Sequence, residues 1–213
     1  LQLIHSGGAW VVAIDTFTGE EVWKVERKSD GVAECEHSYA SPCAVAVGDT
    51  FQIVTHGNDY AIGHDPETGK ELWHMRHRGW SVAPRPVSGH GLVFATVDRD
   101  RPELWAIRLD GTGDVTDTHI AWRSNRSMPQ RCSPLLVGDL LFVVNRGGIA
   151  TCLEAKTGEV VWKERLKGAY SASPIHAKGR IYLVTEEGLT TVIRPMRKLE
   201  VIASNALAMQ PFM

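Results

Sequence analysis

Hydrophobic and polar residues between positions 132 and 166 divide into four short runs. The runs are "CSPLLV", "LLFVVN", "IATCLE" and "VVWKERL". Each run is about six residues long, is rich in β-branched or aromatic residues and is bounded by Gly-Asp, Arg-Gly-Gly or Lys-Thr-Gly. The pattern predicts four antiparallel strands joined by hairpin turns rather than by helix caps.

The end of this pattern belongs to a segment that recurs along the chain. The stretch "CLEAKTGEVVWKERL" has close copies in "AIDTFTGEEVWKVER" and "IGHDPETGKELWHMR". The tryptophan of each period falls at Trp23, Trp73, Trp122 and Trp162. A second marker, Ser-Pro or Ala-Pro, keeps phase with it at residues 41–42, 83–84, 133–134 and 173–174. One structural unit is therefore repeated along the chain.

The Asp-x-x-Thr-Gly element inside the copies has a physical reason. We expect the carboxylates of Asp15 and Asp65 to accept backbone N–H groups across the turn. The glycine supplies the positive φ that a bulged hairpin requires, at Gly19, Gly69 and Gly158. Glu154 stands in place of the aspartate in one copy, and we expect a weaker bond there.

The residue two places before the acid is small in each clear copy, namely Ala13, Gly63 and Cys152. A small residue lets the strand lie close to a neighbouring sheet, and the tryptophan of the next strand then fills the gap. Four-stranded antiparallel units with one small and one large packing position predict an all-β fold, a β-propeller. A linear solenoid or a sandwich is the alternative, but the strand count per repeat favours radial packing.

The two markers divide the chain into a single propeller segment. We expect a partial blade at 1–27, four blades at 37–77, 80–123, 130–166 and 170–203, and the start of a further strand at 204–213. The longest departure from the repeat is "DRDRPELWAIRLDGTGDVTDTH", residues 98–119, interpreted as a charged loop insertion.

The segments "AIDTFTGEEVW", "GHDPETGKELW" and "CLEAKTGEVVW" resemble the tryptophan-docking repeat of the PQQ-like (pyrroloquinoline-quinone-like) β-propeller superfamily. The passages "GDVTDTHIAWR", "YSASPIHAKGRIYLVTEEG" and "IASNALAM" are most similar to its secreted bacterial members of unassigned function. Propellers of this superfamily usually have about seven or eight blades, roughly twice this chain. The resemblance implies a half propeller of about four to five blades, with a compact five-bladed ring closed by the tail as the alternative.

Composition narrows the range of partners. The 213 residues carry a net charge of −2 without long single-sign runs, which disfavours nucleic acid and anionic lipid. No apolar run reaches the ~18 residues that span a bilayer, and the first residues lack the features of a signal peptide. An open arc would expose sheet edges, so self-association through open blade edges is expected.

The cysteines Cys35, Cys43, Cys132 and Cys152 lack metal-ligand spacing and are expected to be small buried hydrophobes. A bridge between Cys35 and Cys43 stays open. Cys132 and Cys152 would lie on the first and third strands of one blade, about two 4.8 Å spacings apart, which is too far for a disulfide.

No catalytic, cofactor-binding or metal-binding residue is assigned. Dehydrogenases of the resembled superfamily hold the quinone against a disulfide of adjacent cysteines, with calcium beside it, and this chain has no adjacent cysteine pair. PQQ with calcium is kept as the alternative cofactor. His74 and His77 lie three positions apart on a strand and are interpreted as exposed histidines on opposite faces.

Loops that converge at one end of a propeller are the better candidates for function. That end collects the segments before each Ser-Pro marker and the turns between second and third strands. The candidate binding residues there are His37, Tyr39, His56, Asn58, Trp80, Asp98, Arg99, Arg131, Asn145, Arg146 and Tyr170. The structural alternative is that Trp80 and Tyr170 pack between blades and that Arg131 and Arg146 form ion pairs with Asp98 or Glu186.

The sequence therefore predicts a non-enzymatic propeller that acts as a binding or scaffolding module for a protein or a small ligand. The resemblance implies a periplasmic or extracellular location. A fragment of a PQQ-dependent quinoprotein dehydrogenase is the first alternative, and a sensory propeller domain of a kinase-linked protein is the second.

Overall fold

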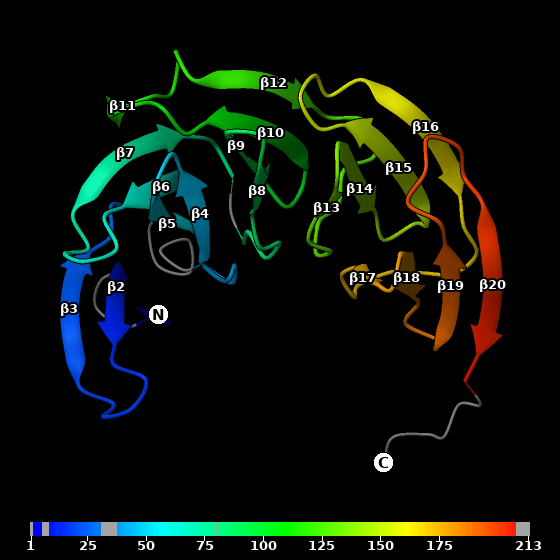
Figure 1. Cartoon of the computed structure of the whole chain (residues 1–213), viewed down its shortest axis with the longest axis horizontal. Helices are drawn as coiled ribbons and strands as arrows, with labels where there is room; N and C mark the ends of the chain where they lie inside the picture. Colours follow the sequence, from blue (N-terminus) through cyan, green and yellow to red (C-terminus); the bar gives the residue numbers. More distant parts are fainter. Residues whose placement is uncertain (1, 6–8, 31–37, 80, 208–213) are drawn as a thin grey trace.

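Five β-sheets follow one another along an open arc in the computed structural model (Figure 1), which describes residues 2–5, 9–30, 38–79 and 81–207. The described residues form strands and turns without any helix, so none of them belongs to a helix that could cross a membrane. The all-β propeller arrangement is confirmed. The arc is unclosed, as in a partial propeller, and residues 208–213 of the tail that would close a five-bladed ring lie outside the described residues.

Antiparallel strands form the body of each sheet, and the last of them in chain order follows the rim of the arc (Figure 1). One further short strand pairs in parallel at the edge of the second sheet. The first sheet contains β1 (Gln2–His5), β2 (Ala9–Ile14) and β3 (Glu21–Glu26). The second contains β4 (Cys43–Val47), β5 (Thr50–His56), β6 (Tyr60–His64) and β7 (Glu71–Arg76). The third contains β8 (Val87–Gly89), β9 (Leu92–Val97), β10 (Glu103–Arg108) and β12 (Ile120–Ser124).

The last two sheets repeat the same order. The fourth contains β13 (Leu135–Val137), β14 (Leu140–Val144), β15 (Ile149–Glu154) and β16 (Val160–Arg165), and the fifth contains β17 (Ile175–Ala177), β18 (Arg180–Val184), β19 (Leu189–Ile193) and β20 (Val201–Ala206). The expected boundary at residue 203 is wrong, because the antiparallel register pairs Leu189 with Ala206. Residues 204–206 therefore complete β20 and do not begin a further strand.

The repeated turn has the hydrogen bonds expected of it. Asp15 Oδ1 accepts the backbone N–H of Phe17 at 2.9 Å and of Thr18 at 2.8 Å, and Asp65 accepts the corresponding pair in the second sheet. Glu154 makes no such bond in the described turn and instead forms an ion pair with Arg197. The aspartate therefore fixes the turn in two copies, and the longer glutamate does not.

Three of the four repeat tryptophans join neighbouring sheets. The indole Nε1 of each donates to a backbone carbonyl of the following sheet, Trp23 to Pro66 at 3.0 Å, Trp122 to Ala155 at 2.9 Å and Trp162 to Met196 at 3.0 Å. A gap-filling tryptophan on the last strand of the first, third and fourth sheets thus connects three pairs of sheets.

Trp73 departs from this arrangement. Its Nε1 donates to Gln52 Oε1 at 2.7 Å within its own sheet. The neighbouring position is taken by strand β11 (Gly113–Asp114), which comes from the third sheet's chain segment and pairs in parallel with β7, Gly113 opposite Trp73. The interpretation of residues 98–119 as one loop insertion is therefore wrong. Its centre is the regular strand β10, whose inward residues continue the hydrophobic alternation, and only the part after β10 is an addition.

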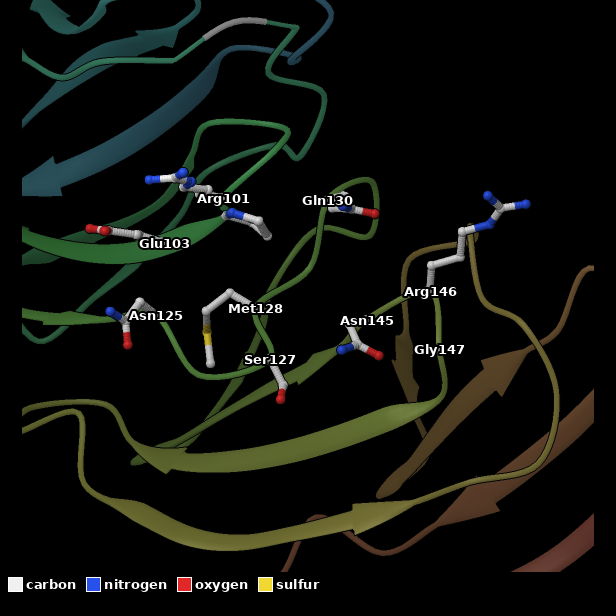
Figure 2. A pocket seen from close by; sticks show the side chains of 10 residues that line it. Arg101, Glu103, Asn125, Ser127, Met128, Gln130, Asn145, Arg146 and Gly147 are labelled. Atoms are coloured by element: carbon white, nitrogen blue, oxygen red, sulfur yellow. The ribbon is translucent and has the colours of Figure 1, made fainter.

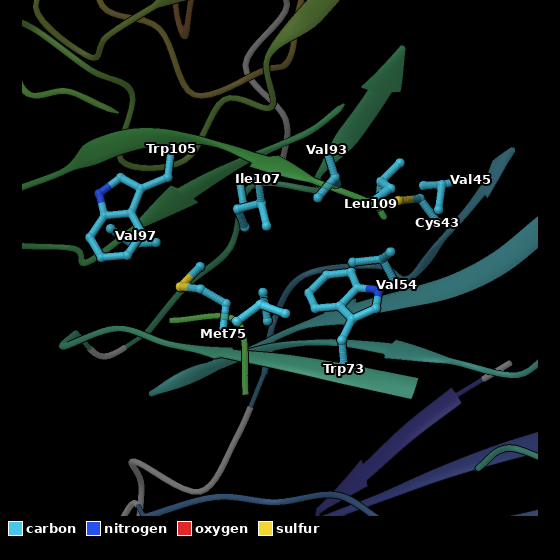
Figure 3. Packing of buried hydrophobic residues seen from close by; sticks show 13 residues of the cluster. Cys43, Val45, Val54, Trp73, Met75, Val93, Val97, Trp105, Ile107 and Leu109 are labelled. Carbon is cyan, nitrogen blue, oxygen red and sulfur yellow. The ribbon is translucent and has the colours of Figure 1, made fainter. Parts of the chain in front are cut away.

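The core lies between the sheets rather than along the axis. Trp73 and Met75 of the second sheet face Val97, Trp105 and Ile107 of the third across one such layer (Figure 3). Similar layers join the third sheet to the fourth and the fourth to the fifth. Cys43, Cys132 and Cys152 are free thiols buried in these layers, and Cys35 lies outside the described residues. Inter-sheet packing thus leaves the ends of the strands available for function.

Candidate functional site

The segments before the Ser-Pro markers meet at one end of the arc. Tyr39, Ser81 and Arg131 each stand two residues before the serine or alanine of a marker, and all three line one hollow of about 540 Å³. Serine side chains of the markers hold these segments together. Ser133 Oγ accepts the backbone N–H of Arg85 at 2.9 Å, and Ser173 Oγ accepts the N–H of Ser133 at 2.9 Å.

A second hollow of about 570 Å³ adjoins the first, sharing Gln130 and Arg146 with it. In Figure 2 the segment that carries Ser127 and Met128 lies between Arg101, at the start of β10, and Asn145, at the end of β14. Asn145 is fixed by its own turn, because its Oδ1 accepts the N–H of Ile149 at 3.0 Å. Polar groups thus line both walls.

A third, smaller hollow of about 300 Å³ shares Arg101 and Glu103 with the second. The guanidinium of Arg123 lies 3.9 Å from the centre of the Trp105 ring, and the Trp105 indole donates to Glu103 Oε2 at 2.7 Å. Cation–π contact holds the arginine over the ring. The three hollows together are called the arginine groove, after the arginines Arg78, Arg99, Arg101, Arg123, Arg131 and Arg146 that line them.

Several of the predicted binding residues line the arginine groove. Tyr39, Arg99, Arg131 and Arg146 line the first hollow, Asn145 the second and Asp98 the third. Tyr39 is 61% exposed. His37 and Trp80 lie outside the described residues.

Three predicted binding residues are buried, so their placement on an accessible face is wrong. His56 ends β5 with its side chain turned inward and is fully buried, and Asn58 in the following turn is 1% exposed. Tyr170 is fully buried between the fourth and fifth sheets, which is the inter-blade packing named as its alternative. One of the alternative ion pairs is also present, since Arg146 Nε lies 3.5 Å from Glu186 Oε1.

Sequence reasoning missed Arg78, Arg101, Arg123 and Gln130 as parts of this end. Arg101 enters because the turn between β9 and β10 is longer than the corresponding turns, a signal visible in the spacing "VDRDRPE". Arg123 lies on the outer strand β12 and reaches the groove only through its contact with Trp105, for which the sequence carries no signal.

His77 is buried as well, contrary to its interpretation as an exposed strand residue. It follows β7 at 3% exposure, and its ring centre lies 5.1 Å from that of His56. Burial, together with the charge of buried Arg27, lowers the pKa of His77 to about 4 and that of His56 well below its usual range. No ring nitrogen of the pair has a hydrogen-bond partner among the described residues. Both histidines are therefore neutral core residues at physiological pH.

Among the residues that the structure describes, no group of three or more histidine, cysteine, aspartate or glutamate side chains is placed to hold a metal ion. The arginine groove offers guanidinium, amide and hydroxyl groups instead. Its guanidinium groups suit the recognition of anionic and hydrogen-bonding ligands.

The sequence profile of the family described as outer membrane protein assembly factor BamB matches residues 7–133 and 114–198. These ranges cover most of the chain. No curated protein matches the sequence significantly.

Solved structures share the fold at low sequence identity. BamB from Moraxella catarrhalis has a TM-score of 0.64 and 16% identity over 92% of this chain and 58% of that one. Quinohemoprotein alcohol dehydrogenase from Comamonas testosteroni has a TM-score of 0.68 and 14% identity, and the match covers 97% of this chain and 41% of that one. The β-propeller domain of Cps50 (Swd1) from Myceliophteria thermophila has a TM-score of 0.64 and 14% identity, and the match covers 92% of this chain and 65% of that one. The chain thus spans less than two thirds of each.

Proposed function

We propose that this chain, which belongs to the family of the outer membrane protein assembly factor BamB, is a non-enzymatic propeller segment that binds a protein partner through the arginine groove. The groove is the observation that carries the proposal. Loops from three successive sheets bring exposed Tyr39 and several arginines to one end, and aromatic and arginine side chains are the usual anchors of protein recognition.

Membership of this family also supports a periplasmic or extracellular location, where the chain would act as a scaffold. The matching description names an assembly factor of the outer membrane, and binding to other proteins fits such a factor. In this proposal the chain uses no cofactor of its own.

Site-specific cross-linking in cells that make the whole protein tests the binding role. The photoreactive residue p-benzoylphenylalanine is placed at Tyr39 in the groove or at Phe17 in the turn between β2 and β3. That turn lies at the opposite strand ends, and both native residues are exposed aromatics, at 61% and 97%. We expect a discrete cross-linked product from position 39 alone. A folded protein with no product from position 39, or the same product from both positions, would overturn the proposal.

The quinoprotein dehydrogenase alternative shares the fold and has its own test. The whole protein is titrated with PQQ and calcium while the tryptophan fluorescence is followed. We expect no saturable quenching. Calcium-dependent quenching at micromolar PQQ would contradict the non-enzymatic proposal and would direct attention to alcohol oxidation.

A further inference from the structure

Positive charge is concentrated in the arginine groove although the chain as a whole is slightly acidic. The groove is lined by six arginines and three acids, whereas the whole chain carries a net charge of −2. Like charges gathered in one concave surface repel one another unless an anion is bound there, and a concave surface strengthens their field. This distribution of charge favours an anionic ligand.

Four of these six arginines have no acid among the described residues within ion-pair distance, and one of the four, Arg123, lies over the Trp105 ring instead. In the described part of the chain no carboxylate lies within ion-pair distance of Arg78, Arg101 or Arg131. Arg146 pairs with Glu186 at 3.5 Å, but its side chain is 57% exposed, so water screens the pair and an incoming carboxylate can replace it. Guanidinium groups in this situation are suited to bidentate bonds with carboxylates.

Two of the acids that line the groove are occupied by internal bonds. Glu103 Oε2 accepts the indole N–H of Trp105 at 2.7 Å, and Asp98 Oδ1 accepts the backbone N–H of Asp100 at 3.0 Å. The Asp98 bond lies in the turn between β9 and β10, which carries Arg99 and Arg101, and the Glu103 bond lies at the start of β10. Each of these two acids thus accepts a bond from its own segment, and neither forms an ion pair with Arg78, Arg101 or Arg131.

The extent of the groove distinguishes a polypeptide from a small anion. The arginines are distributed over three adjoining hollows, and a phosphate-sized ion occupies only part of one of them. An extended chain presents side chains at alternate positions and so reaches several hollows at once. Asn125, Ser127, Gln130 and Asn145 line the middle hollow with groups that hydrogen-bond to a peptide backbone, and Tyr39 supplies an aromatic surface at one end.

We propose that the arginine groove binds an extended segment rich in aspartate or glutamate on the partner protein. This inference rests on the proposed binding function and adds the chemistry of the ligand. The carboxylates pair with Arg101, Arg131 and Arg146, and the middle hollow holds the backbone between them.

A fluorescein-labelled peptide of eight glutamates, titrated into the whole protein, tests the inference through fluorescence anisotropy. A peptide of eight glutamines with the same label is the matched ligand. We expect saturable binding of the glutamate peptide only, weakening as salt rises. Arg131→Gln and Arg146→Gln should each weaken it about tenfold. Arg180→Gln, which removes an exposed arginine of β18 outside the groove, should change it less than about twofold.

The remaining outcomes overturn the inference. Displacement of the peptide by inorganic phosphate at equal concentration would identify a small-anion site, and a sulfated glycan that binds more tightly than the peptide would identify a polysaccharide site. Unchanged binding in Arg131→Gln and Arg146→Gln proteins with the wild-type melting temperature would place the peptide elsewhere. Absence of glutamate-peptide binding together with a cross-link from position 39 would refute the acidic ligand and leave the proposed binding function standing.

Discussion

Trp23 of the first sheet lies directly against Gly69 of the second. A Cβ added at Gly69 would come within 2.5 Å of Trp23 Cε3, and Gly158 has the same relation to Trp122, at 2.6 Å. The Thr-Gly of one sheet and the tryptophan of the preceding sheet therefore form one contact. This explains why the two features recur together in the sequence.

Alanine substitution separates the two reasons for glycine at the Thr-Gly position, namely the positive φ and the close approach of the tryptophan. Gly19, Gly69 and Gly158 share a φ of +74°, but a Cβ at Gly19 meets nothing within 4 Å. Gly19→Ala should therefore cost about 1 kcal/mol of unfolding free energy from backbone strain alone. Gly69→Ala and Gly158→Ala should cost about 2–4 kcal/mol, because the tryptophan must also move. Urea unfolding measures all three, and equal losses would refute the tryptophan contact.

Strand β11 should stabilise the junction at which the indole of Trp73 donates within its own sheet rather than to the next one. Thr116 Oγ1 accepts the backbone N–H of Arg76 at 2.9 Å and donates to Asp114 at 2.6 Å, which attaches the added segment to β7. Thr116→Val should lower the unfolding free energy by about 1–2 kcal/mol, because Arg76 loses its acceptor. Thr112→Val alters an exposed threonine of the same segment and should change stability by less than about 0.5 kcal/mol. Equal losses of stability in the two variants would mean that the Thr116 bond does not attach this segment to β7.

Acid should destabilise the fold through its buried histidines. In the unfolded chain His77 titrates near its ordinary value of 6.5, whereas in the folded protein its pKa is about 4. Between these values the unfolded state binds more protons, so stability falls as the pH is lowered, by roughly 3 kcal/mol for this residue, and it falls no further on that account below pH 4. The charge of buried Arg27 also lowers the pKa of His77.

Unfolding free energies measured at pH 7 and pH 4.5 check this. His77→Phe removes the titrating group and should lose less stability between the two pH values than the wild type. His176→Gln, at an exposed position of β17, should behave as the wild type. A loss in His77→Phe as large as that of the wild type would show that other groups cause the acid sensitivity.

The 213-residue chain expressed alone should associate. Sheet faces at both ends of the arc expose apolar side chains, including Ile14 at 42% and Ile175 at 61%. Exposed apolar patches promote association. Ile14→Lys with Ile175→Lys should reduce the associated fraction seen in size-exclusion chromatography with light scattering. Phe17→Lys, at an exposed turn, should not. A sharp monomer peak for the unmodified chain would count against this expectation.

Local patterns predicted the strands, the repeated turn and the tryptophan contacts, because each depends on residues that recur at a fixed spacing. They did not predict the burial of His56, Asn58 and Tyr170. Polar residues next to a strand end have the sequence pattern of an exposed loop. Whether their side chains are buried depends on the packing of a neighbouring sheet, which the local pattern does not encode. The parallel pairing of β11 with β7 joins segments about forty residues apart, and no local period encodes it.

The arginine groove was predictable only in part for the same reason. The markers placed Tyr39 and Arg131 at one end of the fold, since both precede a Ser-Pro. Arg101 required the length of the turn between β9 and β10, and Arg123 required the three-dimensional contact with Trp105. The overall charge of −2 conceals the cluster, because acids outnumber bases in the rest of the chain.

The most direct test of the central claim is the cross-link from position 39 in a protein that also carries Arg131→Gln and Arg146→Gln. The arginine groove predicts that the cross-linked product disappears, while Arg180→Gln leaves its yield unchanged. A product of undiminished yield in the double variant would contradict the account, because the partner would then be held by some other surface.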